Sequence, residues 1–157
     1  MSSNQNNTSG PIQSDILLEE LTENGVMRLT LNDNKRRNAL SEEMMAKLIK
    51  SLDQASTNYA VRVIVIAGTG PAFCAGHDLK QMSAGRNNAD NGHEYFKKVF
   101  TVCSKLMQLI VNNPKPVIAE VAGVAAAAGC QLVACCDLAI AGESARFVTP
   151  GVNIGLF

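Results

Sequence analysis

The stretch with the clearest potential for chemistry is residues 117–137, V-I-A-E-V-A-G-V-A-A-A-A-G-C-Q-L-V-A-C-C-D. A short apolar run meets Ala122-Gly123, continues through four alanines to Gly129, and then takes on helical spacing. This pattern predicts a strand, a tight turn and the start of a buried helix. Because the side chains there are small, a ligand could approach backbone N–H groups that have no partner within the helix. Such groups bind an anion or a polarised carbonyl oxygen.

A second glycine-bearing stretch, F-C-A-G-H-D-L-K at residues 73–80, follows the run V-R-V-I-V-I-A at residues 61–67. That run is short and rich in β-branched residues, which is typical of a strand buried on both faces of a parallel sheet. Ligands collect at the carboxyl ends of such strands, so both glycine-bearing loops are expected to face one pocket. Converging N–H groups from the two loops would form an oxyanion hole for a thioester or another acyl oxygen.

The elements that position these loops alternate between strand and helix patterns. Residues 16–21 and 26–31 predict a hairpin around Asn24-Gly25. Ser41 predicts the N-cap of an amphipathic helix that runs to about residue 58. The remaining predicted segments are a mobile Gly-, Asn- and Asp-rich loop at 84–93, a helix at 94–112, strands at 117–122 and 138–141, and a short extended piece at 146–148. Together they predict an α/β fold with helices packed on parallel strands.

Composition favours one domain that handles small molecules or protein partners. The chain has 157 residues, 46% of them apolar, with 14 basic and 14 acidic side chains. No dense Lys/Arg run interleaves with aromatic residues, so nucleic acid and a membrane surface are not expected partners. No apolar run approaches the ~20 residues of a membrane span. Residues 1–15 are polar and lack Lys and Arg, which predicts a disordered leader that is neither a secretory signal nor a typical presequence.

Cysteine and histidine usage argues against disulfides and metal. The five cysteines are an odd number, lie mostly in apolar context and lack the spacing of a disulfide framework or a zinc site. We therefore expect them to be reduced, buried and intracellular. His77 and His93 are the only histidines, and neither has a cysteine or carboxylate at metal-ligand spacing, so no metal site is predicted.

Several motifs together resemble the crotonase (enoyl-CoA hydratase/isomerase) superfamily. They are R-N-A-L at 37–40, F-C-A-G-H-D-L at 73–79, the segment 123–132, and Asp137, in the order that the superfamily has them. The resemblance begins near residue 16 and continues to the last residue. It implies a ClpP/crotonase fold, in which ββα units repeat in a spiral. Superfamily members continue into C-terminal helices that close the pocket and build a trimer, so residues 16–157 are expected to be a truncated N-terminal domain with uncovered apolar surface.

The resemblance also assigns an acyl-CoA site. It implies that the thioester oxygen lies between the backbone N–H groups of His77 and Ala128. Five residues would line the path of adenine and pantetheine, namely Ala39, Leu40, Ala75, Asp78 and Leu79. Lys35 and Arg37 would contact the CoA phosphates or, equally, form a charged loop face. Coenzyme A is then part of the substrate and no separate cofactor is expected. A mitochondrial location is implied by resemblance, whereas the leader would leave the protein in the cytoplasm.

The departures from the superfamily bear on catalysis. Hydratases of this superfamily use two glutamates as acid and base, and the matching positions hold Gln131 and Gly151. Proton transfer of this kind contributes ~10²–10⁴ in rate, so hydratase activity is expected to be weak or absent. The leading hypothesis is an acyl-CoA-binding protein of fatty-acid metabolism. The alternative is a non-catalytic acyl-CoA-binding or assembly module. A Clp-type serine peptidase is disfavoured because no serine stands in a nucleophile turn with an identifiable histidine.

Two side chains near these motifs carry both a functional and a structural interpretation, and two others are expected to be structural. The His77 imidazole is either a catalytic base or a polar packing residue. The thiol of Cys130 is either activated by the helix start or an inert filler of apolar space. Asp78 is expected to make a loop or cap hydrogen bond, and Asp137 is expected to be structural.

Overall fold

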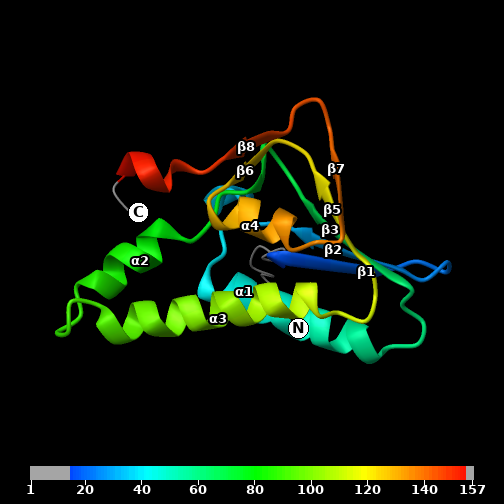
Figure 1. The fold of residues 1–157 in the computed structure, drawn as a ribbon, viewed down its shortest axis with the longest axis horizontal. Coiled ribbons are helices and arrows are strands. Elements are labelled where there is room, and N and C mark those ends of the chain that lie inside the picture. Colours follow the sequence, from blue (N-terminus) through cyan, green and yellow to red (C-terminus); the bar gives the residue numbers. More distant parts are fainter. Residues whose placement is uncertain (1–14, 155–157) are drawn as a thin grey trace, which may run out of the picture.

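The structure, a computed structural model, describes residues 15–154 and contains two sheets (Figure 1). The larger sheet contains, in spatial order, β1 (Leu17–Leu21), β2 (Val26–Leu31), β3 (Val63–Gly68), β5 (Val117–Val121) and β7 (Leu138–Ala141). The smaller sheet contains β4 (Ala72–Cys74), β6 (Val124–Ala126) and β8 (Arg146–Val148). Only β1 pairs in the antiparallel direction. Because β3-β4, β5-β6 and β7-β8 each give one strand to each sheet, the chain winds as the predicted spiral of repeated units.

The hairpin of β1 and β2 confirms the prediction from Asn24-Gly25. Leu17 faces Leu31 at one end of the pair. Gly25 has a φ of +83°, and a Cβ at this position would lie 2.8 Å from the carbonyl oxygen of Ala60. A glycine is therefore required both for the backbone conformation and for the close approach of the neighbouring loop.

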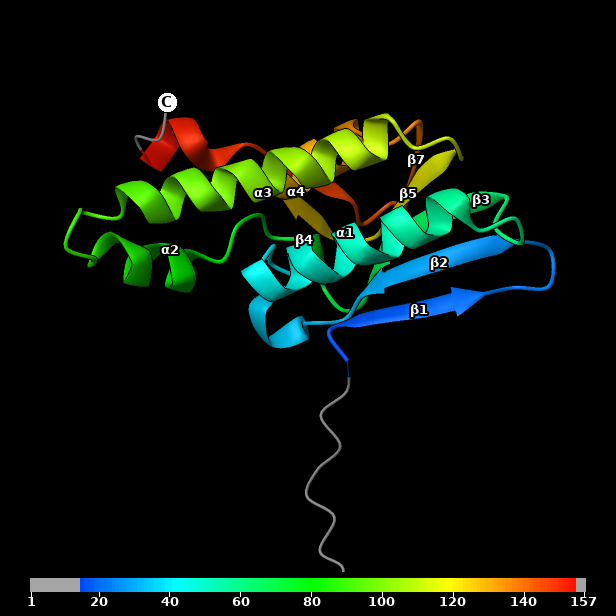
Figure 2. The same ribbon diagram turned by 90° about the horizontal axis from the view of Figure 1, so that it is seen from below.

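Two long helices, α1 (Glu42–Thr57) and α3 (His93–Val111), lie side by side and cover the core (Figure 2). The predicted N-cap of α1 is confirmed, since Ser41 Oγ accepts a hydrogen bond from the N–H of Met44 at 3.1 Å. Each helix buries one apolar stripe in a shared core with the strands. The stripe of α3 includes Val99, Cys103, Leu106, Met107 and Ile110. This packing fixes α3 beside the loops that carry the candidate site.

Several short elements were not predicted. The structure adds the three-residue strands β4 and β6, the 3₁₀ helices η1 (Asn34–Arg36) and η2 (Pro150–Ile154), and the helix α2 (Leu79–Arg86). The loop predicted at 84–93 is therefore shorter, with only residues 87–92 between α2 and α3. The helix α4 (Ala128–Ala134) confirms the predicted helix start after the alanine run.

The burial of β3 differs from its prediction. Ile64 and Ile66 are fully buried, whereas Val63 and Val65 on the opposite face are only half-buried. Within the described part of the chain, β3 is therefore fully buried on one face and only partly buried on the other. The apolar run is explained by the central position of β3 between β2 and β5. The prediction that this strand is fully buried on both faces was wrong.

The last two strands expose apolar side chains. Leu138 and Ile140 on β7 are 62% and 65% exposed, and Phe147 on β8 is 53% exposed. Exposed large apolar side chains of this kind are sites on which other protein can pack. Between residues 15 and 154, no helix is long and apolar enough to cross a membrane.

Candidate functional site

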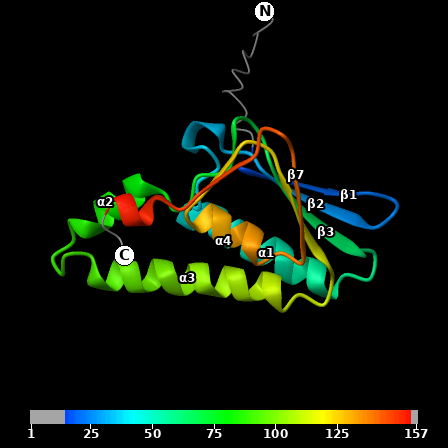
Figure 3. The same ribbon diagram turned by 45° about the horizontal axis from the view of Figure 1, so that its top comes forward.

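A cavity of about 750 Å³ brings together most of the residues singled out in the sequence. It includes His77, Ala128, Gln131 and Gly151, the four positions assigned to chemistry. Its walls are formed by α2, α3, the start of α4 and η2, and Figure 3 shows η2 on the same side of the molecule as α2. The two glycine-bearing loops therefore do face one pocket, as expected from their places at the ends of parallel strands.

The two loops are held together by glycines. Gly76 has a φ of +87°, and a Cβ on it would lie 2.9 Å from the carbonyl oxygen of Ala126 and 3.3 Å from the nitrogen of Ala128. A Cβ on Gly129 would overlap the backbone carbonyl of Cys74. Neither position accepts a side chain without backbone movement. The close approach of the His77 loop to the start of α4 therefore depends on these two glycines.

The N–H groups assigned to the oxyanion hole are available to a ligand. The carbonyl of Ala127 accepts hydrogen bonds from Cys130 and Gln131 at 2.9 and 3.2 Å, which starts α4 and leaves the Ala128 N–H outside the helical ladder. Within residues 15–154, neither the N–H of His77 nor that of Ala128 donates to a backbone or side-chain acceptor. Two such donors on residues that line one cavity could stabilise a developing negative charge on an acyl oxygen.

The backbone of Ala127 is strained. Its φ of 49° and ψ of −117° form a conformation that L residues rarely adopt and that only glycine tolerates well. This conformation turns the chain out of β6 and into α4. Strain at this point therefore orients the Ala128 N–H.

We expect Ala127→Gly to stabilise the protein. Relief of an unfavourable φ/ψ pair gives ~1–3 kcal/mol, and the added freedom of the unfolded chain offsets ~0.5–1 kcal/mol of it, which leaves a gain of ~1 kcal/mol. A rise in melting temperature of about 2–4 °C, measured by calorimetry, checks this. A lower melting temperature would show that the Ala127 methyl group contributes more by packing than its backbone loses by strain.

The two positions of the expected glutamates contribute no acid or base. Gln131 lies on α4 with an exposed side chain, and Gly151 is buried in η2, yet both line the cavity. None of the described residues that line the cavity is Asp, Glu, Lys or Arg. The carboxylate pair that would move protons to and from water is therefore absent from this part of the chain.

A model of the enoyl-CoA hydratase/isomerase family matches residues 21–157. The chain belongs to this family. It is 45% identical over 151 residues to a Xenopus laevis protein named enoyl-CoA hydratase domain-containing protein 3, mitochondrial, and the match covers 96% of this chain and 50% of that protein. The chain spans about half the length of the curated relatives it matches.

Solved structures confirm the crotonase fold. An enoyl-CoA hydratase from Mycobacterium smegmatis superposes with a TM-score of 0.84 at 48% identity, covering 91% of this chain and 54% of that one. The human enoyl-CoA hydratase domain-containing protein 3 superposes with a TM-score of 0.81 at 40% identity, covering 90% of this chain and 53% of that one. The resemblance inferred from the sequence motifs is thus confirmed for both family and fold.

The residues that the family resemblance predicts for the CoA path differ in whether they line the cavity. Ala75 and Leu79 line the cavity. Ala39 and Leu40 are buried beside it, and the Leu40 N–H donates to the carbonyl of Gly76 at 2.7 Å. Lys35 and Arg37 are exposed and are not among the residues that line the cavity.

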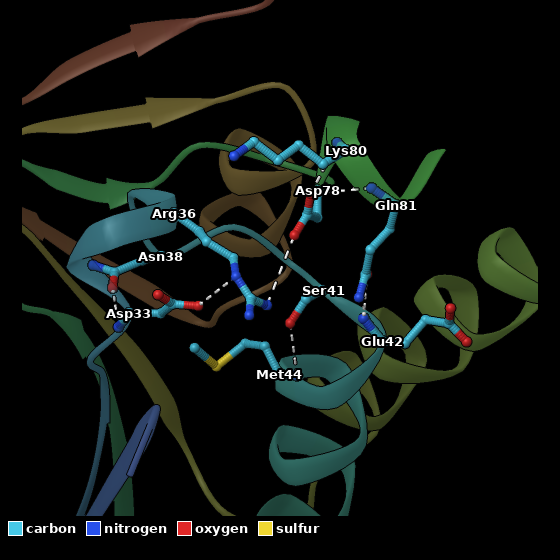
Figure 4. Close-up of polar contacts among 9 residues, drawn as sticks. All are labelled: Asp33, Arg36, Asn38, Ser41, Glu42, Met44, Asp78, Lys80 and Gln81. Carbon is cyan, nitrogen blue, oxygen red and sulfur yellow. Dashed lines mark hydrogen bonds and ion pairs between the residues drawn. The ribbon is translucent and has the colours of Figure 1, made fainter. Parts of the chain in front are cut away.

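Asp78 is a helix cap, as expected. Its Oδ1 accepts hydrogen bonds from the N–H groups of Lys80 and Gln81 at 2.9 and 3.2 Å, at the start of α2 (Figure 4). Its Oδ2 lies 3.8 Å from the guanidinium of Arg36, which also pairs with Asp33 at 3.5 Å. The central residue of the basic trio 35–37 is therefore engaged with protein carboxylates, and Lys35 and Arg37 remain as exposed cations.

Two other side chains have structural roles. Asp137 Oδ2 accepts a hydrogen bond from the N–H of Val117 at 2.7 Å and ties the start of β5 to the turn before β7, which confirms its structural interpretation. The Cys130 thiol donates to the carbonyl of Ala125 at 2.9 Å. All five cysteines are free, and burial raises the pKa of Cys74 to about 12. Cys74 and Cys103 are buried as predicted, whereas Cys130, Cys135 and Cys136 are only half-buried.

The α3 wall of the cavity was not predicted. It is formed by Phe100, Cys103, Ser104, Met107, Gln108, Val111 and Asn112. The helical spacing of apolar residues correctly indicated a buried stripe, but spacing does not reveal whether a stripe meets a core or a cavity. The polar residues Ser104 and Gln108, one turn apart beside that stripe, were the signal that could have indicated a cavity.

Proposed function

We propose that the protein binds acyl-CoA thioesters and polarises the thioester oxygen between the N–H groups of His77 and Ala128, with little or no hydratase activity. One observation carries the proposal. His77 and Ala128, whose N–H groups are assigned to the oxygen, line a single cavity together with Gln131 and Gly151, the positions of the missing glutamates. Family membership supports a thioester as the ligand, and the residues present support polarisation without carboxylate-driven proton transfer.

Of the two contributions to the hydratase rate, oxyanion stabilisation and acid–base catalysis, we expect this cavity to provide only the first. A single oxyanion-hole donor contributes about 10²–10³ in rate, and this contribution is available. Acid–base catalysis by a carboxylate pair contributes about 10²–10⁴, and this contribution is missing. A thioester held here is activated toward enolate formation, while water next to it has no carboxylate to deprotonate it.

We extend the proposal to the CoA part of the ligand and to the location and assembly of the protein. Lys35 and Arg37 are exposed cations near the buried pair Ala39 and Leu40, and we assign them to the CoA phosphates. Coenzyme A enters as part of the substrate, and the proposal needs no other cofactor. The name of the Xenopus laevis relative supports a mitochondrial location. A role in fatty-acid metabolism and a homo-oligomeric state are proposed from the family resemblance.

A second candidate function is an acyl-CoA-binding module that assembles with other protein. The specific observation in its favour is the exposed apolar surface of Leu138 and Ile140 on β7 and Phe147 on β8. This candidate shares the ligand of the first and differs in that no reaction is catalysed.

Calorimetric titration with butyryl-CoA, together with the hydration rate of a short trans-2-enoyl-CoA, tests the proposal. We expect heat of binding and a hydration rate at least 10²-fold below that of a hydratase with both glutamates. A rate equal to that of such a hydratase would overturn the interpretation of Gln131 and Gly151. The absence of any binding heat would remove the premise of both candidates.

A further inference from the structure

We infer that the imidazole of His77 is the proton acceptor of this cavity and takes the α-proton of an acyl-CoA held in the oxyanion hole. The inference rests on the proposed function, because it needs a thioester in the cavity. It differs from the family resemblance, which uses only the backbone N–H of this residue. One residue would then contribute twice, with its N–H to the oxygen and its side chain to the adjacent carbon.

The composition of the cavity wall singles out this side chain. The described lining residues contain two ionisable side chains, His77 and Cys103. Burial raises the pKa of the Cys103 thiol, so that group stays protonated near neutral pH. Histidine is the side chain that ordinarily exchanges a proton near pH 7. With Gln131 and Gly151 in place of glutamates, His77 is the acid–base group that remains.

The ring is held in a defined position. It meets Phe100 edge to face, with ring centroids 5.6 Å apart, and Phe100 in turn stacks on Phe96 at 6.1 Å. The Nδ1 atom of His77 is buried and has no hydrogen-bond partner within residues 15–154, whereas Nε2 is not among the buried atoms without partners. The ring lines the cavity, and we assign Nε2 as the nitrogen that faces it.

The surroundings keep this imidazole neutral. Burial lowers the pKa of His77, and the nearby carbonyl of Leu40 opposes this only in part. The adjacent Asp78 directs its carboxylate to the start of α2 and to Arg36. Among the described lining residues, α3 contributes one ionisable side chain, the Cys103 thiol. The lining residues of α4 and η2 have no ionisable side chain. A neutral imidazole carries one N–H proton, so with that proton on Nδ1 the Nε2 atom has the lone pair that accepts another.

The proposed step is a reversible proton transfer. The Cα–H bond of the acyl group breaks and the proton moves to Nε2 of His77. The electron pair of that bond forms the Cα–C double bond of a thioester enolate, whose negative charge lies on the oxygen between the N–H groups of His77 and Ala128. The reverse step returns a proton to Cα. In D₂O the ring exchanges its proton with solvent, so the acyl group acquires deuterium without any other reactant.

Proton NMR of butyryl-CoA in D₂O with the 157-residue chain tests this step. We expect loss of the α-CH₂ signal with the wild-type protein. His77→Ala keeps the backbone N–H and is expected to slow the exchange by about 10²-fold or more, with butyryl-CoA affinity within about threefold. His77→Phe keeps the ring contact with Phe100 but has no nitrogen, and we expect it to slow the exchange as much.

His93→Ala is the matched control, because His93 is the other histidine and its side chain is 77% exposed. We expect exchange at the wild-type rate in this variant. Exchange that persists in both His77 variants would overturn the inference, and so would binding without exchange in the wild type, which leaves the proposed function standing. Absence of binding in the wild type would instead overturn the proposed function itself.

Discussion

The double variant Gln131→Glu, Gly151→Glu is expected to hydrate a short trans-2-enoyl-CoA about 10²–10⁴ times faster than the wild-type chain. Both positions line the cavity together with His77 and Ala128, so the two new carboxylates would face the thioester that we propose is polarised there. One carboxylate would take a proton from water and the other would deliver one to Cα. Steady-state hydration kinetics of the double variant and of each single variant measure the gain.

The single variants show whether the two carboxylates must act together or whether one added negative charge is enough to raise the hydration rate. Because the two carboxylates act as a unit, each glutamate alone is expected to restore much less than the pair. Gln108→Glu is the matched control, since Gln108 also lines the cavity but lies on α3, away from the family's catalytic positions. A rate increase in this control equal to that of the double variant would show that any negative charge in the cavity suffices. An unchanged rate in a folded double variant that binds acyl-CoA would contradict the prediction.

The parts of the fold with strong local signals were predictable from sequence. Asn24-Gly25 marked the hairpin and Ser41 marked the start of α1 because turn and cap preferences act within four residues. The strands β4 and β6 were missed for the opposite reason. Each has three residues, too few to show a period, and each pairs only with strands distant in sequence.

The candidate site was predictable only through the family motifs. An oxyanion hole made of backbone N–H groups needs small residues and correct backbone angles, and residue types alone do not encode those angles. The strained conformation of Ala127 and the positive φ of Arg37 and Asn38 could not be read from the sequence. In the structure Asn38 is fully buried, and its side-chain amide donates to the carbonyl of Ala72 at 2.8 Å, which ties the R-N-A-L motif to β4.

The proposed oxyanion hole is expected to fail when Gly76 is replaced. Gly76→Ala forces an alanine to a φ of +87° and places its Cβ 2.9 Å from the carbonyl oxygen of Ala126, which is backbone and cannot rotate away. The strain costs ~1–3 kcal/mol of folding free energy. Relief of it must move the His77 loop away from Ala128. We therefore expect a lower urea midpoint together with a loss of butyryl-CoA affinity of about tenfold or more, equivalent to ~1.4 kcal/mol.

Gly142→Ala separates this effect from the general cost of adding a methyl group to a glycine. A Cβ on Gly142 would have its nearest neighbour, the carbonyl oxygen of Val121, at 3.8 Å, an ordinary contact distance. Its φ also lies outside the left-handed region, so a stability change within ~0.5 kcal/mol and unchanged affinity are expected. If Gly76→Ala destabilised the protein but bound butyryl-CoA as tightly as Gly142→Ala does, the thioester would not depend on the spacing of the two loops. The N–H groups of His77 and Ala128 could then not be the pair that holds its oxygen, since that pair exists only while Gly76 allows the loops to meet.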